Sequence, residues 1–291
     1  MPKQRAPDYQ DELEQQRRAW ERKPALRSVY RTWYARIRAE LSPIGPTIEI
    51  GAGSGNFKEF LPDVIATDVF DNGPWLDVLA DARRLPFGDG RAGNVVMVDA
   101  IHHMPRPLDV LREARRVVRP GGRVVILEPA ATPWARLVLR LFHHEPVDLD
   151  QDVFAEDGSP EPGNEGFSFA NQAFATLLFM DSPRETLQRV EGLELKSVQR
   201  SDFIVYPATG GFSYFCLVPA RLAAPLQRAE TRLLSRTSKL TAMRLLIVLE
   251  RCGESRCTAP ACRDSPAVAD HRAHSDAGWT SCSGGGAPVQ P

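Results

Sequence analysis

The sequence predicts an α/β fold: a seven-stranded, mostly parallel sheet with helices on both faces and an antiparallel last strand. A short β-branched run, Thr47–Ile50, leads into a glycine-rich turn and then an amphipathic segment, Phe57–Leu61. Two later apolar runs end in an acidic residue, at Asp68 and at Asp99. Strands that alternate with turns and helical segments are typical of a parallel sheet connected by helices.

The first turn carries three glycines at alternate positions, Gly51, Gly53 and Gly55. Such a turn brings a nucleotide-like ligand against bare backbone. A dinucleotide-binding turn has the spacing G-x-G-x-x-G, which would require glycine where the chain has Asn56. Glu49 precedes the first glycine, and its carboxylate would repel a pyrophosphate but attract an ammonium and a sulfonium group. The turn therefore predicts binding of S-adenosyl-L-methionine (SAM).

Acidic residues after this turn fit the rest of a nucleoside ligand. The run Val64–Asp68 is predicted as a second strand, and an acid at its end accepts hydrogen bonds from both ribose hydroxyls. NAD and SAM share a ribose, so Asp68 does not discriminate between them. Asp81 could accept from the exocyclic amine of adenine, while Val69 and Leu85 could cover the two faces of the ring.

Two further strands complete the predicted cofactor-binding half. Asn94–Asp99 is predicted as a buried fourth strand with its acid at the mouth of the site. Arg119–Arg123 ends a helix and turns into a fifth strand, Val124–Glu128.

Together these segments resemble the class I SAM-dependent methyltransferases, and specifically their type 11 branch, over about residues 44–130. The matching motifs are Glu49–Gly55, Ala66–Val69, Ala80–Phe87, Val98–Met104 and Val118–Arg123. The resemblance implies a Rossmann-like sheet, SAM as cofactor and methyltransferase activity (EC 2.1.1.-). It also implies a set of cofactor-binding residues: Glu49, Gly51, Ala52, Gly53, Gly55, Asp68, Val69, Asp81, Ala82, Asp99 and Ile101.

The candidate catalytic residues are His102 and His103, which follow the fourth strand at the carboxyl edge of the sheet, where ligands bind. A base is needed when the acceptor is a hydroxyl or a protonated amine. The alternative is that one of the two histidines packs or caps the chain. The resulting hypothesis is methyl transfer to oxygen, carbon or nitrogen of a small molecule in a biosynthetic pathway.

Composition excludes several other classes. The chain has 36 basic and 37 acidic residues, so no basic excess predicts nucleic-acid binding. No stretch reaches about 18 uninterrupted apolar residues, so no membrane span is predicted. The amino terminus has no apolar segment typical of a secretory signal, and Cys216 is the only cysteine before residue 250. We therefore expect a cytoplasmic protein without a disulfide framework.

The chain divides into three predicted regions. Residues 1–43 form a helical extension whose aromatic residues either pack on the domain or act as a lid over the site; those residues are Trp20, Tyr30, Trp33 and Tyr34. Residues 44–250 form the SAM-dependent methyltransferase domain. Residues 251–291 are predicted to be a disordered tail, and the spacing of its cysteines is too loose to predict a metal site.

Two insertions in the domain, residues 130–180 and 203–238, are expected to build the acceptor side. The first contains Asn171 and Gln172, for which a capping or surface role is favoured over a place in a pocket. The second separates the predicted sixth and seventh strands, and its aromatic content favours a wall of the acceptor pocket or an oligomer contact. We expect both insertions and the N-terminal helical segment to converge near Gly53 and His102.

Two alternative functions remain from the sequence. One is a non-catalytic SAM-binding module that supports a partner. The other is an NAD-dependent oxidoreductase or epimerase, although no tyrosine is followed by a lysine four residues later. The sequence leaves the oligomeric state open, a homodimer included.

Overall fold

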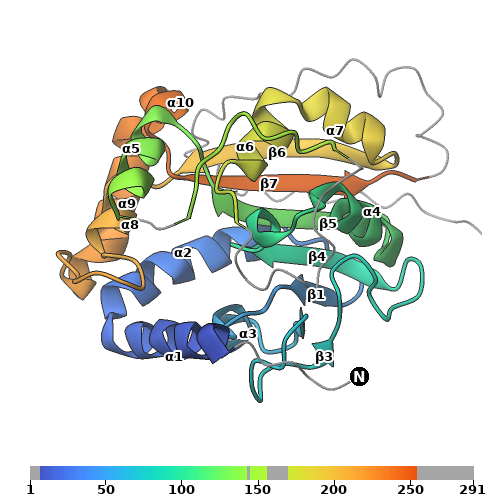
Figure 1. Ribbon diagram of the computed structural model, residues 1–291, viewed down its shortest axis with the longest axis horizontal. Helices are drawn as coiled ribbons and strands as arrows, with labels where there is room; N and C mark the ends of the chain where they lie inside the picture. The colour runs from blue at the N-terminus through green and yellow to red at the C-terminus, as the bar shows by residue number, and fades with distance from the viewer. Residues whose placement is uncertain (1–6, 143–144, 156–169, 254–291) are drawn as a thin grey trace, which may run out of the picture.

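The computed structural model describes residues 7–142, 145–155 and 170–253. The predicted tail lies outside these ranges except for residues 251–253. The described chain forms one sheet in the order β3-β2-β1-β4-β5-β7-β6 (Figure 1). Its strands are β1 (Thr47–Ile50), β2 (Ile65–Asp68), β3 (Val78–Leu79), β4 (Ala92–Val98), β5 (Val118–Pro129), β6 (Leu193–Ser201) and β7 (Arg244–Arg251).

Strand directions agree with the sequence prediction. The strands β1 to β5 are mutually parallel wherever they pair, and β7 lies antiparallel between β5 and β6. The predicted seven-stranded, mostly parallel sheet with an antiparallel last strand is therefore confirmed. The sixth and seventh strands begin or end within one residue of the predicted limits, whereas β5 begins earlier, at Val118.

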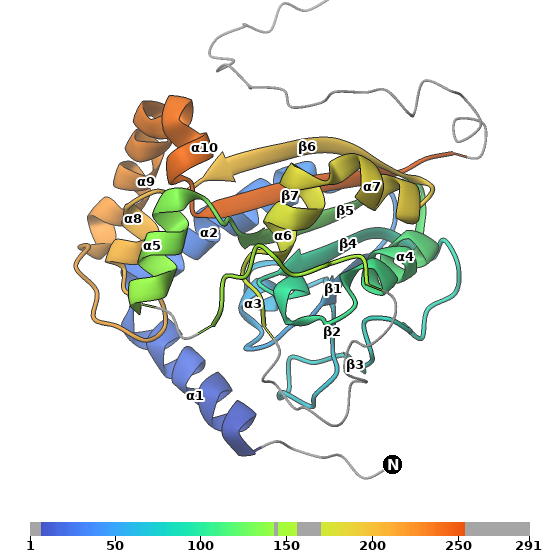
Figure 2. The same cartoon turned by 45° about the horizontal axis from the view of Figure 1, so that its top comes forward.

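Helices cover both faces of the sheet, as predicted. The longer ones are α1 (Pro7–Arg22), α2 (Pro24–Glu40), α4 (Pro107–Val117), α5 (Pro133–Phe142), α7 (Pro183–Arg189) and α9 (Ala220–Leu234). The shorter ones are α3 (Asn56–Phe60), α6 (Phe174–Thr176), α8 (Val205–Ala208) and α10 (Ser238–Thr241). In Figure 2, α4, α6 and α7 lie in front of the sheet and α2 lies behind it, with α9 packed against α2.

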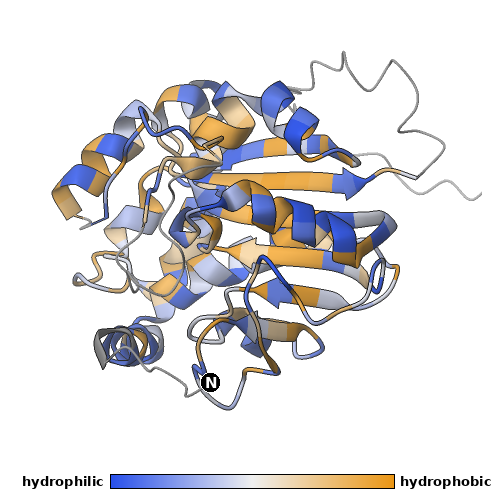
Figure 3. Ribbon diagram, turned by 45° about the vertical axis from the view of Figure 1, so that its right-hand side comes forward, coloured by the Kyte–Doolittle hydropathy of each residue, from blue (hydrophilic) through white to orange (hydrophobic). Residues whose placement is uncertain are grey.

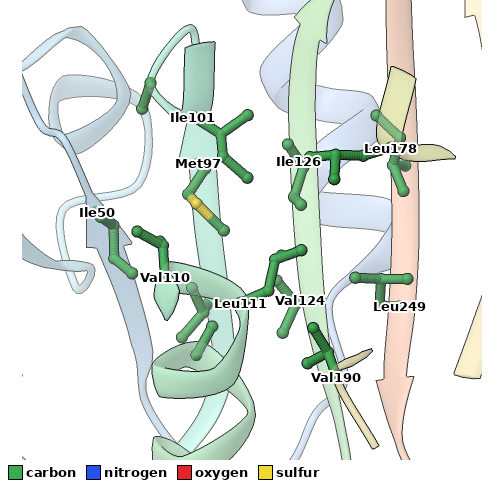
Figure 4. Close-up of a cluster of buried hydrophobic side chains, with 14 of the residues drawn as sticks. Ile50, Met97, Ile101, Val110, Leu111, Val124, Ile126, Leu178, Val190 and Leu249 are labelled. Carbon is green, nitrogen blue, oxygen red and sulfur yellow. The ribbon is translucent and has the colours of Figure 1, made fainter. Parts of the chain in front are cut away.

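The alternation of side chains along β5 explains why two cores form. Val124 and Ile126 contact the α4 side, whereas Val125 and Leu127 contact the α2 side. Because successive residues of a strand point to opposite faces, a strand buried on both faces reads as a continuous apolar run. Figure 3 shows such apolar strands at the centre of the sheet, and Figure 4 shows Leu111 of α4 among the strand residues.

The N-terminal extension is two helices instead of the single helical stretch expected from the sequence. Pro24 occupies the first turn of α2, and proline there has no N–H to donate to the preceding turn. The helix break falls at Lys23, whose ammonium donates to the carbonyl of Gly211 at 2.8 Å. This contact joins the break between α1 and α2 to the insertion that precedes β7.

Candidate active site

The turn between β1 and α3 can be made only with glycine at two of its positions. Gly51 has φ +75°, and a Cβ there would lie 2.8 Å from the Cβ of Ala100. Gly55 has φ +78°, and a Cβ there would lie 2.4 Å from the Trp75 ring. Positive φ strains other residues, and both approaches are closer than packed atoms allow. Gly51 and Ala52 of this turn line a cavity at the carboxyl edge of the sheet.

Glu49 is a buried carboxyl group that forms no ion pair with any described residue. Its side chain is 3% exposed, and its Oε2 has no hydrogen-bond partner among the described residues. Burial, and then the negative charge of Asp68, hold the pKa of Glu49 well above its usual value. The side chain lines the main cavity together with Gly51 and Ala52. A ligand that places an ammonium group in this cavity would give the buried carboxylate a cationic hydrogen-bond donor.

Asp68 ends β2 behind the glycine turn. Its Oδ2 accepts from the Gly53 N–H at 2.9 Å and its Oδ1 accepts from the Phe70 N–H at 3.1 Å. Burial raises the pKa of Asp68, and these backbone hydrogen bonds act in the opposite direction. A carboxylate has about four lone-pair sites, so it can accept from ribose hydroxyls beside its backbone donors.

The residues predicted at the adenine end lie apart from the main cavity. The Asp81 carboxylate pairs with Arg83 at 2.7 Å, and this interaction lowers the pKa of Asp81. Val69 is 55% exposed, whereas Leu85 is buried beneath the surface. Among the described residues, Val69, Asp81 and Ala82 are absent from the cavity lining. Val69 is exposed after β2, and Asp81 and Ala82 are half-buried after β3.

The main cavity has a volume of about 600 Å³ and lies over the carboxyl ends of β1 and β4. Its walls come from the N-terminal helices, α5, the segment after α5 and the insertion before β7. Representative lining residues are Glu12, Tyr30, Tyr34, Val138, Phe142, Gln172, Tyr206, Phe212 and Phe215. The three added segments therefore meet at His102, as expected, whereas Gly53 is absent from the lining among the described residues. The volume is in the range usual for sites that bind small molecules.

Asp99 follows β4 with φ +51°, a conformation that is strained for a residue other than glycine. Its carboxylate forms an ion pair with Arg244, the first residue of β7, and accepts from the Tyr30 hydroxyl at 3.3 Å. The Arg244 guanidinium lies 4.5 Å from the Trp33 ring centre and 4.7 Å from that of Tyr206. These side chains form one wall of the cavity, and within that wall the charges of Asp99 and Arg244 neutralise each other.

His102 lies in a short helical turn (Ile101–His103) after β4 and is 3% exposed. Its Nδ1 lies 2.5 Å from Oε2 of Glu128, whose Oε1 accepts from the backbone N–H groups of Ala100 at 2.7 Å and Ile101 at 2.8 Å. Burial by itself lowers the pKa of His102, but the carboxylates of Glu128 and Glu145 raise it to about 10.

His103 and Glu145 complete a cluster around His102. The His102 Nε2 lies 3.5 Å from Oε2 of Glu145, and the His103 Nε2 lies 3.9 Å from Oε1 of the same carboxylate. All three side chains line the cavity. Ile101, in contrast, is 0% exposed and packs in the core beneath the turn. The structure therefore brings the predicted residues Glu49, Gly51, Ala52, Asp99, His102 and His103 to one cavity.

Several residues of this site were not predicted from the sequence. Glu128, Glu145 and Arg244 had no assigned role, although the acid that ends the fifth strand repeats the pattern of Asp68 and Asp99. The preferred capping or surface role of Gln172 is wrong. Its side chain is 3% exposed, lines the cavity and donates to Oε2 of Glu145.

Comparison with known proteins agrees with the cofactor-binding half. Residues 48–126 match the family model of the methyltransferase domain. This match confirms the resemblance to class I SAM-dependent methyltransferases, a family whose methyl donor is SAM.

Related sequences cover only part of the chain. An uncharacterized protein of Mycobacterium tuberculosis is 32% identical over 133 residues, which are 41% of this chain and 45% of that protein. A demethylmenaquinone methyltransferase of Beutenbergia cavernae is 32% identical over 117 residues, which are 34% of this chain and 48% of that enzyme. The matched regions thus span about half the length of these relatives.

Solved structures with a similar arrangement include a geranyl diphosphate C-methyltransferase of Streptomyces coelicolor, at 12% identity and a TM-score of 0.46. That match covers 76% of this chain and 78% of that one. A SAM-dependent methyltransferase of Thermotoga maritima gives 14% identity and a TM-score of 0.47, covering 80% of this chain and 94% of that one.

Among the described residues, no helix has the length and apolar content needed to cross a membrane.

Proposed function

We propose that this protein transfers the methyl group of SAM to a small-molecule acceptor that binds in the main cavity. The observation that carries the proposal is the shared cavity: Glu49 and the glycine turn line one part of it, and His102 and His103 line another. A methyl donor and an acceptor must lie in contact for a direct transfer, and one cavity that holds both sets of side chains meets this requirement.

Residues of the cofactor half would hold SAM from three sides. Glu49 would bind its ammonium group, because a buried carboxylate without a partner is stabilised by a cation. Asp68 would accept from the ribose hydroxyls, and Asp81 with Ala82 would lie at the adenine. When bound, SAM supplies a methyl carbon made electrophilic by the adjacent positive sulfur.

The acceptor side excludes water and orients the acceptor. Burial raises the pKa of Tyr30 and of Tyr34, so both phenols stay neutral and act as hydrogen-bond donors at the cavity wall. Alignment of two reactants in such a site contributes up to roughly 7–11 kcal/mol to lowering the barrier. A hydroxyl acceptor must also lose its proton, and we place its acceptance at His103 or Glu145, because the neighbouring carboxylates raise the pKa of His102 to about 10 and this histidine already holds a proton.

The acceptor has an apolar or aromatic body with few polar groups. Four large apolar residues at the cavity are exposed to solvent, and they come from α5 and from the segment before α9. They are Phe142 (55% exposed), Tyr214 (47%), Phe215 (76%) and Leu217 (70%). An apolar rim of this kind favours a small organic acceptor from a biosynthetic pathway over a nucleic acid, which requires a basic surface.

Labelled SAM provides the test. The purified protein is incubated with methyl-labelled SAM and a small-molecule extract, and label is sought in extractable products by mass spectrometry. We expect one or a few labelled compounds that are absent when protein is omitted. Stabilisation by SAM without any labelled product would favour the non-catalytic binding module. Stabilisation by NAD and not by SAM would instead favour the oxidoreductase and would overturn the proposal.

A further inference from the structure

We infer that His102, His103 and Glu145 form a binding site for one divalent transition-metal ion on the wall of the acceptor cavity. The use of that ion in catalysis rests on the proposed function, but its binding does not. The sequence predicted no metal site, because the adjacent histidines lie in one segment and the glutamate lies in another, and only the fold brings the two segments together.

Distances within the cluster suit a single ion. One ligand atom from each of the three residues can be chosen so that all lie within 4.8 Å of one another. The Nε2 atoms of His102 and His103 lie 3.5 Å and 3.9 Å from the two oxygens of Glu145. Bonds of about 2.1 Å to a tetrahedral ion place its ligand atoms about 3.4 Å apart. Small side-chain shifts would therefore bring all three groups to one ion.

The outer contacts already hold the ligand atoms in place. Glu128 is 0% exposed and lies against Nδ1 of His102, which leaves Nε2 on the side of Glu145. A histidine that binds a metal usually donates its other ring N–H to a carboxylate in this way. Gln172 donates to Oε2 of Glu145 and so orients this second carboxylate. These two contacts are the arrangement expected around a built metal site.

Charge also favours a dication. The carboxylates of Glu128 and Glu145 lie next to two imidazoles that are neutral when they act as ligands, so one dication would neutralise the group. Arg244, another cation on the cavity wall, is already paired with Asp99. The two carboxylates attract a cation, and a bound ion would displace the proton that His102 holds without it.

The donor atoms define the class of ion. Two imidazole nitrogens and one carboxylate oxygen favour Zn²⁺, Mn²⁺, Fe²⁺, Co²⁺ or Ni²⁺ over Mg²⁺ and Ca²⁺, which prefer oxygen ligands alone. Three protein ligands leave at least one coordination position toward the cavity. An oxygen of the acceptor, from a hydroxyl or a carbonyl group, would fill that position.

The test titrates metal into the full-length protein after treatment with a chelator. Zn²⁺ and Mn²⁺ binding is measured by equilibrium dialysis with elemental analysis, and the ligands of bound Zn²⁺ are identified by X-ray absorption. We expect one ion per chain with nitrogen and oxygen ligands. The five cysteines of the chain are competing ligands, and sulfur in the spectrum would place the zinc at cysteine and overturn the inference.

Variants connect the ion to the cluster. His103→Gln and Glu145→Gln each remove one ligand and should weaken binding at least tenfold. Glu128→Gln, which removes a positioning contact, should weaken it by about 10- to 100-fold. Glu12→Gln is the matched control, because Glu12 lines the cavity on the α1 side, and it should bind the ion as the unmodified protein does.

Thermal stabilisation by SAM, measured on every variant, shows whether the fold and the cofactor site are intact. Equal metal affinity in the control and in both ligand variants would overturn the inference, as would the absence of stoichiometric binding. If SAM stabilises the protein and the metal does not bind, the metal site alone is wrong. If the metal binds and SAM does not, the proposed function fails and the metal site stands.

Discussion

Replacing Glu49 by glutamine should weaken cofactor binding and, at neutral pH, increase the stability of the protein without ligand. The substitution keeps the shape of the side chain and removes the charge. In the protein without ligand, the carboxylate is buried and its Oε2 has no hydrogen-bond partner among the described residues, so removal of the charge should stabilise the fold at neutral pH. In the complex, the Glu49 carboxylate would accept hydrogen bonds from the SAM ammonium group, so removal of its charge should weaken SAM binding.

The magnitude on the cofactor side follows from the type of interaction. A hydrogen bond to a charged group contributes about 1.5–3 kcal/mol, which corresponds to about a 10- to 150-fold rise in the Kd for SAM. The Kd is measured by isothermal titration calorimetry, with Glu12→Gln as the control for loss of an acid from the same cavity. We expect the control to change the Kd by less than about twofold.

The stability side has a defined pH dependence. The pKa of Glu49 is raised well above its usual value of 4.5 by burial and then by Asp68. A raised pKa means that the folded state binds the proton more tightly than the unfolded chain does. The contribution of Glu49 to stability is therefore fully present below pH 4.5 and is lost as pH rises through the folded-state pKa.

Thermal unfolding without ligand at several pH values checks this sign. Glu49→Gln should have the higher melting temperature at pH 8, and the difference should shrink toward pH 5. SAM binding should also release protons from the unmodified protein, which calorimetry detects by comparing buffers of different ionisation enthalpy. Unchanged SAM affinity in the variant, or a stability difference that grows toward low pH, would refute the role given to Glu49.

Three further predictions concern the walls of the site. Asp68→Asn should weaken SAM binding by about tenfold, because the ribose hydroxyls lose a charged acceptor; an unchanged thermal shift with SAM would contradict this. Gly55→Ala should destabilise the fold by about 1–3 kcal/mol in urea denaturation and alter the fluorescence of Trp75, because the added Cβ would lie 2.4 Å from that ring. Gly88→Ala is its control, because the nearest atom there belongs to the flexible side chain of Arg91, at 3.4 Å. Arg244→Met should lower the free energy of unfolding by about 3 kcal/mol, because the Asp99 carboxylate loses its partner. Adding Asp99→Asn should restore part of the lost stability. A double variant no more stable than Arg244→Met would show that the ion pair is not the cause.

The cofactor half was predictable because its signals are local. The run from Glu49 to Gly55 specifies a strand, a turn that needs glycine and the start of a helix within a few residues. Asp68 and Asp99 follow apolar runs, and parallel strands place their carboxyl ends at one edge of the sheet. Short-range pattern and a general rule of sheet geometry were therefore sufficient to place Glu49 and Asp99 at one cavity, whereas Asp68 lies outside its lining among the described residues.

The acceptor half could not be predicted in the same way. Arg244 reaches Asp99 only because β7 inserts between β5 and β6. Glu145 meets His102 through a segment that has no periodic pattern, and Gln172 is buried by the same segment. Such contacts join residues far apart in the chain, and no local propensity specifies them. The helix break at Pro24, in contrast, was visible in the sequence as a proline within a helical pattern.

The position of Arg244 has a consequence for the order in which the two halves of the site can be completed during synthesis. β1, β2 and β4, with the glycine turn, emerge from the ribosome well before β7. Until β7 arrives, β5 has one unpaired edge, and the carboxylate of Asp99 lacks the guanidinium that neutralises it. Pairing across such a long separation is slow because a large loop must first close. The nascent protein should therefore gain its cofactor-binding elements first and its complete acceptor wall last.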